Sequence, residues 1–191
     1  GAGKFGLVLA KIAAENKNQV LLYSRRAEEV NSINDDGKSL SGVKFPSNKK
    51  TSATGSTKDL VNCDVLLVTV PSKDFRSTIE SLDINIKTTK IASCAKGFEE
   101  KTGKLMSEIL EDDFGVPENN IFILSGPNLS KEISDKELTG TVIAGTDKDF
   151  IDQLSKSMSN DYFIPFSNSD RYGVEMGGAM KNIYAIISGY F

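Results

Sequence analysis

Short apolar runs rich in valine and isoleucine alternate along the chain with amphipathic segments. A run that is apolar at every position is typical of a strand buried on both faces of a parallel sheet, and the segments between such runs are typical of crossover helices. The pattern therefore predicts an α/β fold with a doubly wound, mostly parallel sheet. The predicted strands are Val20–Ser24, Asp64–Val70, Thr89–Cys94, Ile121–Ser125, Thr141–Gly145 and Tyr162–Phe166.

Amphipathic periodicity predicts helices between these strands. The polar stretch Asp35–Ser56 is predicted to be a long loop that holds one short edge strand, Lys50–Thr54. The predicted helices are Lys4–Asn16, Ala27–Asn34, Lys73–Leu82, Lys104–Asp113, Leu129–Ser134, Asp149–Met158 and Tyr172–Tyr190.

The composition excludes several classes of function. A formal charge of −3 and scattered lysines and arginines give no basic field for nucleic acid. No apolar run is long enough to span a membrane, and no signal-peptide core is present. Cys63 and Cys94 are too few for a disulfide framework, and without histidine an ordinary zinc site cannot form, so no metal is predicted. A reducing, cytoplasmic setting is expected.

A glycine-rich motif opens the chain. Gly1, Gly3 and Gly6 fit G-x-G-x-x-G and lead directly into a helical pattern, with the strand Val20–Ser24 following. In that setting the glycines permit a tight turn, close approach of a pyrophosphate and close packing of helix on strand. The helix N-terminus supplies amide groups and positive dipole. The motif predicts a Rossmann-type dinucleotide site.

Two arginines follow the next strand, where an acidic residue would select NAD. Arg25 and Arg26 stand at that position, and guanidinium groups bind phosphate in a bidentate manner. They favour the 2′-phosphate of NADP over NAD, although both cofactors stay open. The alternative interpretation is that the two arginines only solvate the start of a helix.

Polar groups follow three other predicted strands, at the edge where ligands bind in such sheets. The segments are Val70-Pro71-Ser72, Cys94-Ala95-Lys96-Gly97 and Ser125-Gly126-Pro127-Asn128. Lys96 is the most informative, because a cation there can meet a phosphate or a polarised oxygen. Cys94 has no histidine to activate it and is interpreted as a small core residue. Glu99, Glu100 and Glu111–Asp113 are interpreted as solvated faces.

Lys181 is the best candidate for a catalytic acid. It lies in the helical stretch Gly173–Ile183 among glycine, alanine and methionine, and the chain has no histidine for this role. Desolvation in such surroundings can lower the pKa of a lysine and bring proton donation within reach of neutral pH.

Taken together, these segments resemble the bacterial-type NAD(P)-dependent glycerol-3-phosphate dehydrogenases over almost the whole chain. The resemblance implies reduction of dihydroxyacetone phosphate to sn-glycerol 3-phosphate, which feeds phospholipid synthesis. The matching segments are Gly1–Gly6, Val70-Pro71-Ser72 with Phe75, Ala95–Glu99 with Thr102-Gly103, Ser125-Gly126-Pro127 with Lys131-Glu132, and Gly173–Glu175 leading into Gly177–Asn182.

The resemblance also implies roles for single residues. Lys181 matches the catalytic lysine, and Asn182 beside it would touch the substrate. Lys96 would contact both cofactor and substrate, while Gly126 and Asn128 would line the substrate site. The implied nucleotide contacts, besides the glycine motif, are Lys4, Phe5, Arg25, Pro71, Phe75 and Ser130. The family commonly has other residues in place of Lys4, Asn128 and Ser130.

The expected organisation is a dinucleotide-binding domain at residues 1–168, with 169–191 as the first helix of a helical substrate-binding domain whose remainder is absent. Both chain ends are interpreted as cuts, so the chain alone is expected to be inactive. A homodimer stays open. The rival functions are a related lysine-dependent 3-hydroxyacid or sugar-acid dehydrogenase, and a dinucleotide-binding or sensor module without turnover.

Overall fold

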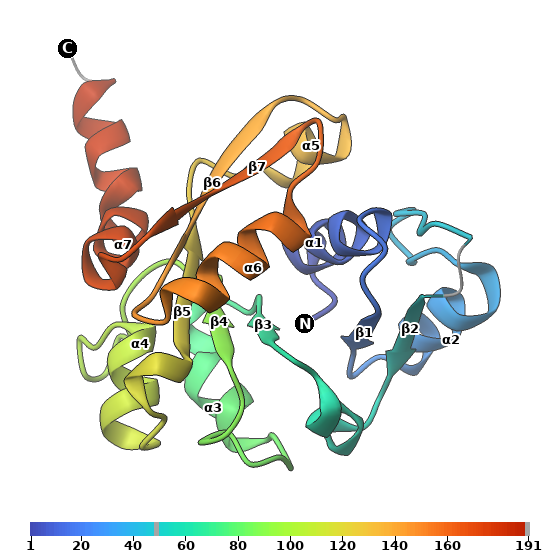
Figure 1. The fold of residues 1–191 in the computed structure, drawn as a ribbon, viewed down its shortest axis with the longest axis horizontal. Helices are drawn as coiled ribbons and strands as arrows, with labels where there is room; N and C mark the ends of the chain where they lie inside the picture. Colours follow the sequence, from blue (N-terminus) through green and yellow to red (C-terminus); the bar gives the residue numbers. More distant parts are fainter. Residues whose placement is uncertain (48–49, 190–191) are drawn as a thin grey trace.

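The computed structural model describes residues 1–47 and 50–189, and it confirms the predicted α/β architecture (Figure 1). A two-stranded parallel sheet pairs β1 (Val20–Tyr23) with β2 (Thr51–Thr54), which is the predicted edge strand. A second sheet has the order β3-β4-β5-β6-β7. Its strands are Leu66–Val68, Ile91–Ser93, Ile121–Ser125, Thr139–Ala144 and Phe163–Asn168.

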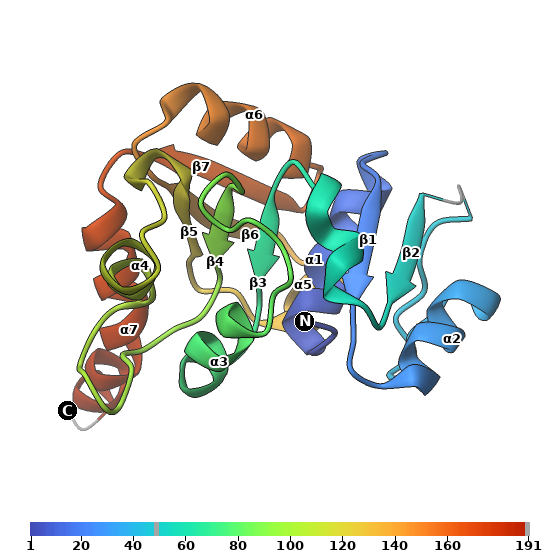
Figure 2. The same ribbon diagram turned by 90° about the horizontal axis from the view of Figure 1, so that it is seen from below.

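The larger sheet is parallel except at one pairing. Strands β3, β4 and β5 run parallel, as do β6 and β7, whereas β5 and β6 are antiparallel. The arrows of β1, β2, β3 and β4 point the same way in Figure 2. The carboxyl ends of these strands therefore lie at a common edge, where the chain's N-terminus also lies.

Each predicted helical segment contains an α-helix among the described residues. The 3-10 helices Thr57–Asn62 and Glu118–Asn120 were not predicted, and Tyr190, the predicted end of the last helix, lies outside the described residues. The predicted helix Lys104–Asp113 contains only the short α4, followed by one π-helical turn at Ile109–Asp113. A π turn often marks a functional position in a helix. The α-helices are α1 (Lys4–Glu15), α2 (Ala27–Asp36), α3 (Phe75–Glu80), α4 (Met106–Glu108), α5 (Ser130–Ser134), α6 (Lys148–Met158) and α7 (Arg171–Ser188).

Strands β4 and β5 are buried on both faces, because successive side chains enter different hydrophobic clusters. Ile91 and Ile121 pack with α3 and α4, whereas Ala92 and Phe122 pack with α1, α5 and α6. This explains why both strands appear as unbroken apolar runs in the sequence.

Helix α1 joins the two sheets. Val8, Leu9 and Ile12 belong to the cluster over the larger sheet, whereas Leu7 and Ala10 pack with β1, α2 and β2. A helix that is apolar on two sides is favourable only where both sides are covered. The position of α1 therefore fixes its glycine-rich start between β1 and β3 (Figure 2).

Gly6 makes the close packing at that start possible. A Cβ at Gly6 would lie 2.0 Å from the carbonyl oxygen of Gly1 and 2.5 Å from Oγ1 of Thr69. At Gly3, by contrast, a Cβ would meet no atom within 4 Å. Gly3, the N-cap residue, and Gly6, in the first turn of α1, thus have different physical requirements.

We expect Gly6→Ala to lower the free energy of unfolding by about 1–3 kcal/mol, because the new methyl group overlaps main-chain atoms. Gly3→Ala is the matched control and should change it by no more than about 0.5 kcal/mol. Urea unfolding of the full-length protein measures both values. Equal stability of the wild type and the Gly6 variant would contradict this account of the packing.

Candidate active site

The glycine-rich turn leaves the N-terminus of α1 open. Gly3 is the N-cap residue, no side chain caps the helix, and the space beside Gly3 is free. Thr69, just beyond β3, donates its hydroxyl to the carbonyl oxygen of Gly1 at 2.9 Å and holds the turn at the strand ends. Uncapped amides at a helix start, with room in front of them, suit the pyrophosphate of a dinucleotide.

The two arginines after β1 differ in their surroundings. Arg26 donates from Nη2 to Oε2 of Glu29 at 2.9 Å, and Glu29 is fully buried. Arg25 is exposed, and it forms no ion pair with a described carboxylate. Arg25 is therefore the freer of the two to bind a ligand phosphate.

Lys96 and Lys181 come together at the carboxyl edge of the larger sheet. Nζ of Lys96 donates to the carbonyl oxygen of Gly126 at 2.7 Å, which ties the loop after β4 to the loop after β5. Burial lowers the pKa of Lys96, and the positive charge of Lys181 lowers it further. Two ammonium groups this close favour an anion between or beside them.

Lys181 lines a pocket of about 310 Å³ between α7 and the end of β5. Small residues let the helix approach the strand, since a Cβ at Gly178 would lie 2.4 Å from Oγ of Ser125. At Gly177 the adjacent space is open. The remaining lining residues are Gly126, Pro127, Val142, Gly173 and Val174.

Asn128 lies beside this pocket with one polar atom unsatisfied. Its side chain is 8% exposed, and Nδ2 donates to Oγ1 of Thr141 at 2.9 Å. Its Oδ1 accepts no hydrogen bond from any described residue. Oδ1 lies 3.3 Å from where a Cβ of Gly126 would stand, at a backbone φ of 155° that favours glycine. A buried, unpaired acceptor is costly unless a ligand donates to it.

Two polar contacts that the sequence did not predict fix helix α7. Glu175, 4% exposed, accepts hydrogen bonds from the backbone amide of Ser107 at 3.1 Å and from its hydroxyl. Arg171 pairs with Glu111 at 2.6 Å. Burial is the main cause of the raised pKa of Glu175. The helix that carries Lys181 is thus attached to the segment 105–113.

The interpretation of Glu99 as a solvated carboxylate is wrong. Glu99 is 9% exposed and accepts from Nε and Nη2 of Arg76 at 2.7 and 2.9 Å. Its other donor is the hydroxyl of Thr102 at 2.6 Å. The Arg76 bonds, with Thr102 adding to them, lower the pKa of Glu99 to about 2. Asp113 likewise pairs with Arg76. Neither contact could be predicted from local sequence, because Arg76 is distant from both carboxylates along the chain.

The other predicted nucleotide contacts fall into two groups. Lys4 and Pro71 are exposed, and Phe5 and Ser130 are half-buried. Phe75 is 0% exposed and packs in the cluster with Ile79 and Ile91, so its ring does not reach the crevice and the predicted contact is not supported. Asn182 lies within α7, but its side chain is outside the described part of the structure.

Cys94 is a core residue, as predicted. It is buried in the main cluster, and burial raises the pKa of its thiol to about 12, which excludes a role as a nucleophile at neutral pH. In residues 1–47 and 50–189 no cluster of side chains could hold a metal ion. No helix in the same residues has the length and apolarity needed to cross a membrane.

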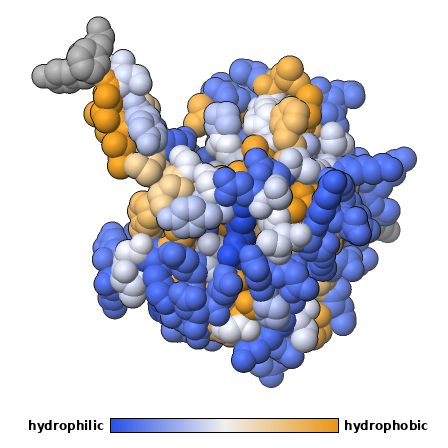
Figure 3. Space-filling view, turned by 60° about the vertical axis from the view of Figure 1, so that its left-hand side comes forward, coloured by the Kyte–Doolittle hydropathy of each residue, from blue (hydrophilic) through white to orange (hydrophobic). Residues whose placement is uncertain are grey.

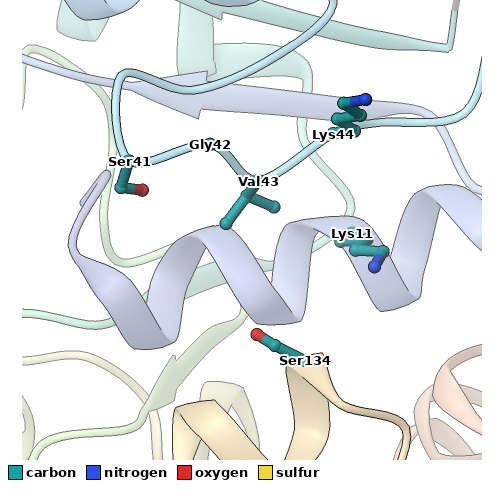
Figure 4. A pocket seen from close by; sticks show the side chains of 6 residues that line it. All are labelled: Lys11, Ser41, Gly42, Val43, Lys44 and Ser134. Carbon is teal, nitrogen blue, oxygen red and sulfur yellow. The ribbon is translucent and has the colours of Figure 1, made fainter.

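A second hollow, of about 370 Å³, lies away from the strand ends. Figure 4 shows it between α1, the loop 41–44 and α5, with Lys11, Lys44 and Ser134 on its walls. The ammonium groups of the two lysines do not converge in this view. The candidate residues Lys181 and Gly126 line the other pocket.

Comparison with known proteins identifies the family to which the chain belongs. A sequence-family model described as NAD-dependent glycerol-3-phosphate dehydrogenase N-terminus matches residues 1–151. A glycerol-3-phosphate dehydrogenase (NAD(P)+) from Ectopseudomonas mendocina is 38% identical over 193 residues, covering 99% of this chain and 56% of the relative. One from Alcanivorax borkumensis is 39% identical over 194 residues, covering 99% and 55%. The chain thus spans about half the length of these relatives.

A solved structure agrees with the fold. The crystal structure of glycerol-3-phosphate dehydrogenase from Coxiella burnetii has a TM-score of 0.83 and 29% sequence identity to this chain. The match covers 99% of this chain and 58% of the other. Because the match covers nearly the whole of this chain, it confirms the Rossmann-like α/β fold.

We expect Glu99 to stabilise the folded state at neutral pH and to lose this effect in acid. Its folded pKa is about 2, below the ordinary 4.5, so its stabilising effect is complete above pH 4.5 and is lost as pH falls toward 2. Urea unfolding should show Glu99→Gln less stable than the wild type at neutral pH, with the difference shrinking in acid. Glu100→Gln, exposed in the same loop, is the control. A difference independent of pH would refute the pairing with Arg76.

Proposed function

Because the chain belongs to the family of NAD-dependent glycerol-3-phosphate dehydrogenase N-termini, we propose that it forms the dinucleotide-binding part of such an oxidoreductase. The proposed reaction transfers hydride between NAD(P)H and dihydroxyacetone phosphate and gives sn-glycerol 3-phosphate for glycerophospholipid synthesis. The observation that carries the proposal is that Lys181 and Gly126 line one pocket while Lys96 donates to the carbonyl oxygen of Gly126 and feels the charge of Lys181.

The described residues suit a dinucleotide at the start of α1. The uncapped amides there, with open space at Gly3, would hold the pyrophosphate. Lys4, Phe5, Pro71 and Ser130 are accessible enough to contribute contacts. The bound nicotinamide would supply hydride chemistry, and the protein would supply position and charge.

Each residue of the pocket has a proposed task. Lys181, as an ammonium, protonates the alkoxide oxygen that forms when the carbonyl is reduced. Lys96 binds the anionic substrate and stabilises the developing negative charge. Asn128 accepts a hydrogen bond from a substrate hydroxyl through its unpaired Oδ1. Gly126, and Asn182 next to the catalytic lysine, complete the proposed substrate contacts.

We propose NADP as the preferred cofactor, with Arg25 as the main contact to its 2′-phosphate. Arg25 forms no ion pair with the residues that the structure describes, whereas one nitrogen of Arg26 is already engaged by Glu29. The relatives are named for NAD(P)+ and do not decide between the two cofactors.

We further propose the division into a dinucleotide-binding domain, 1–168, and the beginning of a helical substrate-binding domain, 169–191. Its support is the exposed apolar surface of α7. Figure 3 shows the outer turns of this helix standing away from the body of the molecule, with apolar residues along one side. These exposed residues are Ile183, Tyr184, Ile186 and Ile187. Such a face is expected to pack against further protein.

For the cofactor, we expect Arg25→Gln to weaken NADPH binding about tenfold, because a hydrogen bond to a charged group contributes about 1.5–3 kcal/mol. NADH binding should change little. Arg26→Gln is the matched variant and should have the smaller effect. Fluorescence titration with each cofactor measures the dissociation constants, and equal wild-type affinities for NADPH and NADH would reject the preference.

For catalysis, we expect Lys181→Ala in the full-length protein to lower kcat for dihydroxyacetone phosphate by about 100-fold or more, the scale of a positioned general acid. Nucleotide affinity should stay nearly constant. Lys96→Ala should raise KM for that substrate as well as lower kcat. A coupled spectrophotometric assay gives both constants. Near-normal turnover of the Lys181 variant would exclude the proposed acid.

A further inference from the structure

The loop that carries Lys96 needs external support. The ammonium group of Lys96 is partly desolvated and lies near the charge of Lys181, and both effects disfavour the charged form of Lys96. The hydrogen bond to Gly126 compensates only if the loop holds Nζ at that carbonyl oxygen. A lysine side chain is long and flexible, so the backbone must limit where it can reach.

Glu99 fastens this loop three residues after Lys96. The fork of Arg76 meets both of its carboxylate oxygens, and Thr102 adds a third donor. The backbone closes a turn at the same place, because the amide of Glu99 donates to Lys104 and the amide of Gly103 donates to Glu99, both at 2.8 Å. A bidentate pair fixes orientation as well as distance.

Arg76 in turn is fixed to a second element. Its Nη2 also donates to Oδ2 of Asp113 at 2.5 Å, and Lys104 at the far end of the loop donates to Oδ1 of the same residue at 2.6 Å. Asp113 ends the π-helical turn. Both ends of the segment 99–104 are therefore attached to the carboxylate of Asp113, Glu99 through Arg76 and Lys104 directly.

The near side of the loop has little freedom either. Gly97 has a φ of 117°, and a Cβ there would lie 3.2 Å from Oγ of Ser72 in the loop after β3. The backbone between Lys96 and Glu99 thus passes close to Ser72 in a conformation that favours glycine. A displacement of Glu99 would be transmitted through this short segment to Lys96.

We propose that Glu99, held by Arg76, is a positioning residue that places the ammonium of Lys96 at the pocket edge. The inference rests on the proposed function only for the task of Lys96 in binding substrate. The placement itself is a property of the described chain.

The test uses Glu99→Gln and Arg76→Lys in the full-length protein. The first variant removes the charge of Glu99, and the second keeps a positive charge but loses the planar fork. Glu100→Gln is the control, since it makes the same change on an exposed neighbour with no hydrogen-bond partner among the described residues. Thr102→Val removes one donor and is the milder variant if either of the others does not fold.

The first readout is the titration of Lys96 by NMR of protein with 13Cε-labelled lysine, assigned from the signal that Lys96→Arg lacks. Lys181 and the Cys94 thiol are the charged or titratable groups found to act on it. If the loop loosens, Lys96 becomes hydrated and its pKa rises toward the ordinary lysine value. We expect this rise in the Glu99 and Arg76 variants and none in the control.

The second readout is kinetic. KM for dihydroxyacetone phosphate should rise about tenfold in both variants, with kcat changed less, because misplacement weakens substrate binding first. Folded variants with wild-type Lys96 titration and wild-type KM would overturn the proposal, even if their melting temperature falls. The wild type could show no turnover while the Glu99 and Arg76 variants still show the expected rise in the pKa of Lys96. That result would refute the proposed function and leave the positioning role intact.

Discussion

The burial of α1 on two sides is the constraint on which the rest of the structure depends. Its residues complete the hydrophobic cluster of the larger sheet and also that of β1 and β2, so neither sheet is fully covered without it. Covering both requires the helix to start in the narrow space near Thr69, where only glycine fits at position 6. The open amides of the helix start therefore lie at the strand ends as a consequence of packing, at the place proposed for the pyrophosphate of a dinucleotide.

The pocket opposite that helix start is stabilised in a different way. Lys96 and Lys181 come from a loop and from a helix, and their charges repel. Such an arrangement persists only when each of the two elements is firmly attached to the rest of the fold. The segment 105–113 provides both attachments: Ser107 and Glu111 contact α7, and Asp113 contacts Arg76 and Lys104. An anionic substrate would relieve the repulsion that the protein maintains.

Local sequence patterns were sufficient to predict the strands and to single out Lys96 and Lys181. They were insufficient to predict the side-chain contacts that hold the loop and the helix carrying these lysines. Strand β5 was predicted with its observed bounds, because unbroken apolar runs need no knowledge of partners. The roles of Glu99 and Glu175 could not be read from the sequence, since their partners are 23 and 68 residues away. A glutamate in a polar stretch has the same local pattern whether it is solvated or buried against an arginine. Phe75 is the opposite case. The resemblance to the family suggested that its ring lines the crevice, but the ring is buried in the hydrophobic core.

Glu99 and Glu175 show how a partner decides the effect of burial on the pKa of a glutamate. Glu99 meets a guanidinium, and its pKa falls, so its contribution to stability is present above its ordinary pKa and is lost in acid. Glu175 meets mainly the amide and hydroxyl of Ser107, and burial raises its pKa, so its contribution is complete below its ordinary pKa and declines as pH rises through the raised value. The attachment of the Lys96 loop is therefore strongest at neutral pH, whereas that of the Lys181 helix weakens toward it.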